Sequence, residues 1–115
     1  MAVEDGATLG YLLGCFLRTS SSMLSRKKIG VASVLQLYES VQKPFTTMNV
    51  KGADVNREMY HLPDGEEQIS RDAELANLSW QSRSKWIWID SKYQSEIMGS
   101  DRLEAAQRAY AELLA

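Results

Sequence analysis

The 115-residue sequence is poor in the residue types from which most metal centres and nucleophilic sites are built. It contains one cysteine, Cys15, and one histidine, His61. A lone cysteine cannot form a disulfide within the chain, and one cysteine with one histidine cannot supply the four side-chain ligands of a structural zinc site. A catalytic triad that depends on histidine would have to use His61. The composition therefore predicts a reduced chain without a bound metal.

Basic residues are not in excess either. Lysine and arginine total 13 against 15 aspartates and glutamates, for a net charge of -2. Such a chain has no basic excess to neutralise a phosphate backbone, so no nucleic-acid partner is expected. The apolar segment 9–17 is shorter than the roughly 20 residues that cross a bilayer. Glu4 and Asp5 stand where a secretory signal needs basic side chains. We therefore expect a cytoplasmic protein that does not enter a membrane.

What the sequence does contain is helical patterning. Hydrophobic residues make up 44% and charged residues 24%, which is a globular balance, and the length suits one domain or part of one. Apolar residues recur every three or four positions, which indicates amphipathic helices. Pro44 removes one N–H group and predicts a kink or a short break near Gln42. We predict an all-α fold of four or five helices with one aromatic connector. The predicted helices cover residues 2–18, 31–62, 64–75 and 101–114.

Short polar motifs mark where these helices begin and end. His61-Leu62-Pro63-Asp64-Gly65 ends the second long segment, because proline restricts the residue before it and Asp-Gly favours a turn. Asp64 with Glu67, and Asp101 with Glu104, have the spacing of a capping box, and each pair predicts a helix start. Residues 18–22 are predicted as a helix end and loop, and residues 26–28 as a solvated basic turn.

The first predicted helix has two different faces. Its large apolar residues form one stripe: Leu9, Leu12, Leu13, Phe16 and Leu17. Gly6, Gly10 and Gly14 recur every four residues with Ala2 and form a second stripe that has almost no side chains. Each glycine costs a helix about 1 kcal/mol relative to alanine. We therefore expect something to pack very close to this stripe: a helix, a sheet or a flat ligand. The glycine spacing does not fit a phosphate-binding loop.

The connector is rich in aromatic residues. Trp80, Trp86 and Trp88 fall within nine residues, beside Ile87 and Ile89. This segment is predicted to be a short strand or an aromatic-rich loop. A ligand cage is one interpretation of the tryptophans. We favour the other, in which they are anchors that bury a large area and hold the C-terminal region to the core.

Few side chains are candidates for catalysis, and each has a structural role that accounts for it. His61 is either a general base or, as we predict, a residue that satisfies carbonyl groups at a helix end. Cys15 lies among leucine and phenylalanine, surroundings that do not activate a thiol, and is interpreted as a small core residue. Glu4 and Asp5 suit the positive end of the first helix. No catalytic residue is therefore assigned.

Motifs along the chain resemble a known enzyme family. Met1-Ala2-Val3-Glu4-Asp5-Gly6-Ala7-Thr8-Leu9-Gly10 resembles the helix that follows the second flavin-binding motif of FAD-dependent aromatic monooxygenases of the salicylate hydroxylase type. Further motifs resemble the C-terminal helices of that family, in the same order: Leu37-Tyr38-Glu39, Lys43-Pro44, Asn56-Arg57, His61-Leu62-Pro63-Asp64-Gly65 and Arg71-Asp72-Ala73.

The resemblance covers residues 1–76, whereas the connector and the terminal helix at 77–115 resemble the family only loosely. It implies that residues 1–115 form a single partial domain, a C-terminal fragment of an α/β flavoprotein monooxygenase fold. It also implies FAD as cofactor, NAD(P)H as reductant and a small aromatic substrate that the intact enzyme hydroxylates. Met1 and Ala2 would lie at the edge of the flavin site, where the start of the first helix points at the flavin.

The family's Gly-x-Gly-x-x-Gly turn, its Gly-Asp motif and its substrate-binding sheet are not found in these 115 residues. The chain alone is therefore expected neither to bind FAD tightly nor to turn over substrate. In the family the glycine stripe would pack beneath the flavin and against the nucleotide-binding sheet. In this chain we expect the first helix to expose a large apolar, glycine-rich surface through which copies of the chain self-associate. The alternative is a non-enzymatic helical interaction module that docks through the first helix or the tryptophan segment.

Overall fold

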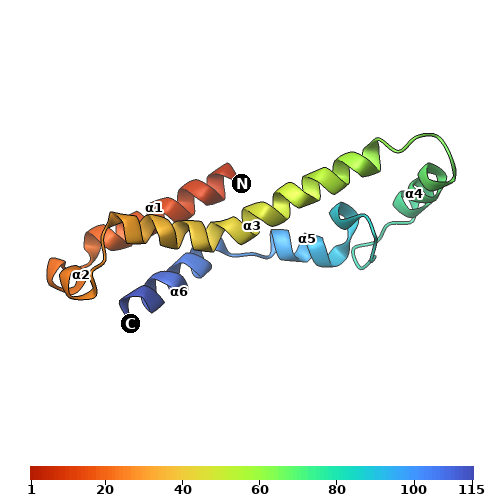
Figure 1. Ribbon diagram of the computed structural model, residues 1–115. Coiled ribbons are helices and arrows are strands. Elements are labelled where there is room, and N and C mark those ends of the chain that lie inside the picture. Colours follow the sequence, from red (N-terminus) through yellow and green to blue (C-terminus); the bar gives the residue numbers. More distant parts are fainter. The chain divides into compact units, whose positions relative to one another are not determined.

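The computed structural model describes residues 1–115 and contains only helices and their connections (Figure 1). The elements are α1 (Ala2–Arg18), α2 (Ser21–Lys27), α3 (Val31–Tyr60), α4 (Glu66–Ala76), the 3-10 helix η1 (Ile87–Ile89), α5 (Ser91–Met98) and α6 (Arg102–Leu114). The all-α prediction is confirmed. The short helices α2 and α5 were not predicted, and they bring the number of α-helices to six. None of the helices combines the length and the apolar composition that crossing a membrane requires.

The chain divides into two compact units, which are described separately. Residues 1–46 together with 101–115 form one unit, which we call the terminal unit. Residues 47–100 form the other, which we call the central unit. Helix α3 contributes its first part to the terminal unit and its second part to the central unit.

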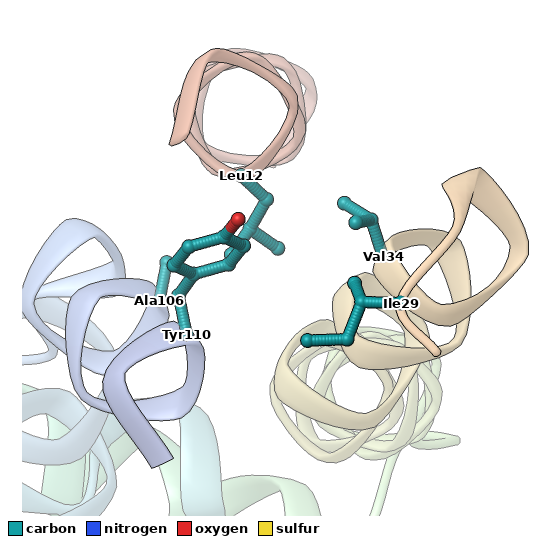
Figure 2. Packing of buried hydrophobic residues seen from close by; sticks show 5 residues of the cluster. All are labelled: Leu12, Ile29, Val34, Ala106 and Tyr110. Carbon is teal, nitrogen blue, oxygen red and sulfur yellow. The ribbon is translucent and has the colours of Figure 1, made fainter. Parts of the chain in front are cut away.

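The hydrophobic core of the terminal unit lies where α1 packs along α6. Figure 2 shows Leu12 of α1 beside Ala106 and Tyr110 of α6, with Ile29 and Val34 across the core from α6. Leu12, Val34 and Ala106 are fully buried. Burying one leucine or valine side chain contributes about 1.5–3 kcal/mol. This cluster therefore holds together helices that come from opposite ends of the sequence.

A set of polar contacts joins the same helices. Gln42 of α3 is only 3% exposed, and its Nε2 donates a hydrogen bond to Oδ1 of Asp5 in α1 at 2.7 Å. The Gln42 Oε1 atom accepts a hydrogen bond from Nε of Arg102 in α6 at 3.0 Å. The Arg102 guanidinium also lies 4.8 Å from the centroid of the Phe45 ring. Because a buried amide is costly unless it is paired, these contacts favour one arrangement of α1 and α6 on α3.

The stretch predicted as a loop and a solvated turn contains a helix instead. Helix α2 begins after Ser20, whose hydroxyl accepts a hydrogen bond from the backbone N–H of Met23 at 3.4 Å. It ends at Lys28, which has a left-handed backbone conformation with φ of 55°. The helix end predicted at Arg18 is confirmed, whereas the loop and turn predictions are wrong for residues 21–27, which form α2. A serine side chain can bond to the backbone of a loop, and it can equally well cap the start of a helix. The serine-rich sequence therefore did not reveal whether this stretch forms a loop or a helix.

Helix α3 continues through Pro44 without interruption. The predicted short break near Gln42 is therefore wrong. Pro44 is exposed; it removes the hydrogen bond that its own N–H would donate, and its ring crowds the carbonyl group four residues earlier. Gln42 and Phe45, on either side of it, are buried. The contacts of the inner face of α3 thus outweigh the cost of a proline on its outer face.

The junction between α3 and α4 is stabilised by a residue that the sequence did not point to. Helix α3 ends at Tyr60, two residues short of the predicted range and directly before the segment 61–65 that was predicted to end it. Gly65, with φ of 155°, precedes α4 and no side chain caps this helix, so the predicted Asp64 capping box is wrong. Instead, Arg71 donates through Nη1 to the carbonyl oxygen of Met59 at 2.5 Å. This bond satisfies a carbonyl in the last turn of α3, where no intrahelical donor remains.

The predicted cap of the last helix is confirmed. Oδ1 of Asp101 accepts a hydrogen bond from the backbone N–H of Glu104 at 3.0 Å, at the start of α6.

The aromatic connector is an ordered loop with one 3-10 turn, and Asp90 holds it. Oδ1 of Asp90 accepts hydrogen bonds from Nε of Arg83 at 2.7 Å and from the N–H of Ser84 at 2.9 Å. Oδ2 accepts from the N–H of Tyr93 at 3.3 Å and caps α5. These bonds, above all the one from Arg83, lower the pKa of Asp90 from 3.8 to about 2. Because the connector contains a 3-10 turn and no strand, the predicted alternative of a strand is wrong.

Tyr93 seats α5 on the second part of α3. Its hydroxyl donates a hydrogen bond to the carbonyl oxygen of Met48 at 3.3 Å. The same hydroxyl comes so close to Gly52 that a Cβ atom at that position would lie 1.7 Å from the hydroxyl oxygen. Burial raises the pKa of Tyr93. Gly52 is thus the one glycine of α3 that close packing requires.

Candidate functional site

The clearest candidate for a functional surface is the side of α1 that points away from the core. We define the outer face of α1 by the uncharged residues that share this side: Ala2, Val3, Gly6, Ala7, Gly10, Gly14 and Leu17. On the opposite side, Thr8 and Leu12 are fully buried. Val3 is 83% exposed and Leu17 is 80% exposed. The helix therefore exposes an apolar, glycine-rich side, as predicted.

Nothing within the chain accounts for the glycines of this face. A Cβ atom at Gly6 or Gly10 would meet no other atom within 4 Å. At Gly14 it would approach only the side chain of Arg18 in the same helix, at 3.1 Å. Each glycine weakens the helix by about 1 kcal/mol relative to alanine. Glycines on a helix face permit the close approach of a partner, and within the terminal unit no element makes that approach at Gly6 or Gly10.

Two further residues of α1 complete the description of this helix. Leu17, predicted to belong to the large apolar stripe, lies on the outer face instead. Cys15 is half-buried and packs against the core cluster of the terminal unit, as predicted for a small core residue. Nη2 of Arg18 lies 3.6 Å from its sulfur and donates a weak hydrogen bond to it.

The start of α1 contains Met1 and Ala2, the residues that the resemblance assigns to the edge of a flavin site. Both are exposed. The ammonium group of Met1 pairs with Oε2 of Glu4 at 2.9 Å, and this hydrogen bond lowers the pKa of Glu4. Asp5, in the same turn, accepts the hydrogen bond from Gln42. Glu4 and Asp5 place two carboxylates in the first turn of α1, and these repel an anionic ligand. This helix start therefore does not fit the diphosphate of FAD.

Two cavities lie in the central unit, and neither includes Met1 or Ala2. The first, which we call the indole cavity, has a volume of about 450 Å³. It is lined by Leu78, Ser79, Trp80, Trp88, Ile89, Ser91 and Gln94. The second, which we call the His61 cavity, has a volume of about 500 Å³. It is lined by Arg57, Glu58, His61, Leu62, Glu67 and Trp86.

The tryptophans of the connector have different roles. Trp86 is 7% exposed and is the anchor that the sequence predicted. Its Nε1 atom is buried without a hydrogen-bond partner, and the ammonium of Lys85 lies 4.8 Å from the ring centroid. Trp80 is 97% exposed and Trp88 is 38% exposed. For these two residues the anchor interpretation is wrong, because neither indole is buried.

His61 has the structural role that the sequence predicted. It follows the last residue of α3, and its Nδ1 lies 2.8 Å from the carbonyl oxygen of Arg57, which it satisfies. Glu67, across its cavity, pairs with Lys85 at 3.2 Å. His61 thus has neither a nucleophile nor an orienting carboxylate bonded to it, so the geometry assembles no catalytic base. No group of three or more potential metal ligands occurs in the chain.

The surroundings of the indole cavity were only partly visible in the sequence. Its two tryptophans stood out, but Ser91 and Gln94 did not, because they belong to α5, a helix that was not predicted. The available signal was Asp90, an N-cap residue directly before a short helical stretch.

Comparison with known proteins identifies a relative that is a flavin enzyme. The chain is similar to the FAD-dependent monooxygenase OpS4 of Beauveria bassiana (strain ARSEF 2860), with 30% identity over 112 residues. The chain resembles part of an FAD-dependent monooxygenase. The aligned residues make up 96% of this chain and 24% of OpS4, so the chain spans about a quarter of the relative's length. No protein-family model matches the chain, and no solved structure gives a significant match.

Proposed function

We propose that this chain is the C-terminal helical part of an FAD-dependent aromatic monooxygenase of the salicylate hydroxylase type, in which the outer face of α1 packs against the flavin-binding body. The observation that carries this proposal is the open space at Gly6 and Gly10, where no atom lies within reach of a Cβ. Alanine would strengthen the helix at both positions. The similarity to OpS4, which extends over 96% of the chain, supports the same assignment.

The role of α1 in the complete enzyme would be support and positioning. A sheet or a flavin ring approaches a helix closely only where the facing side chains are small, and the outer face meets this condition between Gly6 and Gly14. Met1 and Ala2, at the start of the helix, would border the flavin ring. Bound FAD, reduced by NAD(P)H, would supply the transfer of one oxygen atom from O2 to an aromatic substrate, while the other oxygen atom leaves as water. The chain itself would contribute no catalytic group and would not be active alone.

A chimera tests the proposal directly. In this experiment the chain replaces the matching 112-residue segment of OpS4, and the flavin content of the purified protein is measured from its visible absorbance. We expect the chimera to retain FAD and Gly10→Leu to lower its flavin content, because the added side chain blocks close approach. In the isolated chain the same substitution should leave the melting temperature unchanged or raise it.

Gln107→Leu is the matched control, since it adds the same side chain at an exposed position of α6. It should affect neither protein. A chimera that tolerates Gly10→Leu would contradict the proposed role of the outer face, and stoichiometric flavin in the isolated chain would contradict its inactivity alone. The coding sequence directly upstream of the Met1 codon is an independent test. An in-frame Gly-Asp motif and glycine-rich turn are expected there.

A second candidate function is a non-enzymatic helical interaction module. The observation in its favour is the exposure of large apolar side chains in both units, with Leu17 at 80% and Trp80 at 97%. Such a module would bind a partner through these side chains without any flavin. The upstream coding sequence distinguishes the two functions, because only the enzyme fragment requires nucleotide-binding motifs before Met1.

A further inference from the structure

The indole cavity of the central unit has one firmly held wall. The ring of Trp88 lies 6.1 Å from the ring of Tyr93, at an angle of 50°. Tyr93 is itself buried and bonded to the carbonyl oxygen of Met48. On the same side, Nε2 of Gln94 donates a hydrogen bond to the carbonyl oxygen of Trp88. Trp88 is therefore preorganised, and a ligand that contacts it does not have to order it first.

A second part of the lining is Trp80, a tryptophan whose backbone is held while its ring is in solvent. The N–H of Ser79 donates to Oγ of Ser82 at 2.9 Å, and the N–H of Ser82 donates to the carbonyl oxygen of Ser79 at 3.1 Å. The N–H of Ser91 donates to the carbonyl oxygen of Ser82 at 2.9 Å, which ties this turn to the start of α5. Trp80 lies within the turn, yet it is 97% exposed. Tryptophan is highly buried on average, so an indole left in solvent beside a cavity is unusual.

The chemistry of the lining is apolar and uncharged. Leu78, Ile89 and the two indoles supply apolar surface, and no charged side chain lines the cavity. Oγ of Ser91 and Oε1 of Gln94 form no hydrogen bond within the chain, so they are available to a ligand. Small-molecule sites share this composition, with mostly apolar walls and a few polar groups that fix orientation. The volume of about 450 Å³ also falls in their range of roughly 300–1,000 Å³.

We propose that the indole cavity is a binding site for one uncharged, flat aromatic compound, which stacks on Trp80 and Trp88 and hydrogen-bonds to Ser91 or Gln94. An ionic ligand would lose its hydration without gaining a countercharge from this lining. This site goes beyond the proposed function, because it belongs to the central unit, whereas the proposed function depends on α1 in the terminal unit. The failure of either proposal therefore leaves the other unaffected.

The test uses the full chain and N-phenyl-1-naphthylamine, an uncharged aromatic probe that becomes fluorescent in apolar surroundings. Titration is expected to saturate at one probe per chain and to quench tryptophan fluorescence. Trp80→Ala is the decisive variant, because a residue that is 97% exposed contributes little to folding. It should keep the melting temperature of the unmodified chain, and its affinity for the probe should fall about tenfold, the loss expected for one aromatic pair.

Ile69→Ala is the matched control. Ile69 is 64% exposed on α4 of the same unit and does not line the cavity, so its truncation should leave probe affinity unchanged. An anionic naphthalene sulfonate should bind at least about tenfold more weakly than the neutral probe. The proposal is overturned by binding that does not saturate, by unchanged affinity in Trp80→Ala, or by an equal loss in Ile69→Ala. A proline-rich peptide that binds the cavity when the naphthyl probe does not would also overturn it, and would assign these indoles to a macromolecular partner.

Discussion

Substitution of Gly52 by alanine is the sharpest test of how the central unit is packed. The new methyl group would lie 1.7 Å from the hydroxyl oxygen of Tyr93 and 2.6 Å from its Cζ atom, distances that no real contact adopts. Tyr93 cannot move aside freely, because it is buried, it follows the cap of α5 at Asp90, and its hydroxyl is bonded to the carbonyl oxygen of Met48. Gly52→Ala must therefore displace the ring of Tyr93 from its place on α3.

The magnitude follows from three terms. Overpacking a filled site costs about 1–3 kcal/mol, and loss of the hydrogen bond between Tyr93 and Met48 costs about 1 kcal/mol. The higher helix propensity of alanine returns about 1 kcal/mol. Gly52→Ala should thus lower the free energy of unfolding of the central unit by about 1–3 kcal/mol. The same substitution at Gly10, where a Cβ meets nothing, should raise stability by up to about 1 kcal/mol.

Urea unfolding followed by tryptophan fluorescence is the appropriate assay. All three tryptophans of the sequence belong to the central unit, so their emission reports this unit and not the terminal one. Gly52→Ala should shift the midpoint of the transition to lower urea. Adding Tyr93→Phe should recover part of the loss, since it removes the atom that lies closest to the new methyl group. A Gly52→Ala variant as stable as the unmodified chain would refute the seating of α5 on α3.

Three further predictions concern pH, core polarity and association. Because the pKa of Asp90 is lowered from 3.8 to about 2 in the folded chain, its contribution to stability is present above pH 4 and is lost as the pH falls through 2. Asp90→Asn should abolish that part of the pH dependence in acid titrations followed by tryptophan fluorescence, and an unchanged profile would refute the role of the carboxylate. Thr8→Val removes a hydroxyl that is fully buried without a partner, and thermal melts should show a gain of about 1 kcal/mol or more. A loss of stability in this variant would indicate that the hydroxyl is bonded after all. If the outer face of α1 mediates self-association, Leu17→Lys should shift the chain toward monomers in sedimentation velocity, whereas Gln107→Lys should not, and an identical distribution for both variants would count against that face.

Much of the helical architecture could be predicted from local signals. The 3.6-residue periodicity indicated α1, α3, α4 and α6, and Asp101 marked the start of α6 through a side-chain bond that involves only its own neighbours. The glycine stripe of α1 was equally visible, because spacing along a helix decides which residues share a side. These features depend on residues within a few positions of one another, which is why the sequence reveals them.

Only the tertiary structure decided the rest. Whether α3 would continue through Pro44 depended on Gln42, whose partners Asp5 and Arg102 lie 37 and 60 residues away in the sequence. Trp86 is a buried anchor, whereas Trp80 and Trp88 line the indole cavity. Which of these tryptophans is covered depended on where α5 docks. That position depends on Gly52, which makes room for Tyr93, a residue of a helix that the sequence pattern did not show. Burial and close approach are set by contacts between distant segments, so a sequence pattern can identify which side chains are apolar but not which of them the fold will cover.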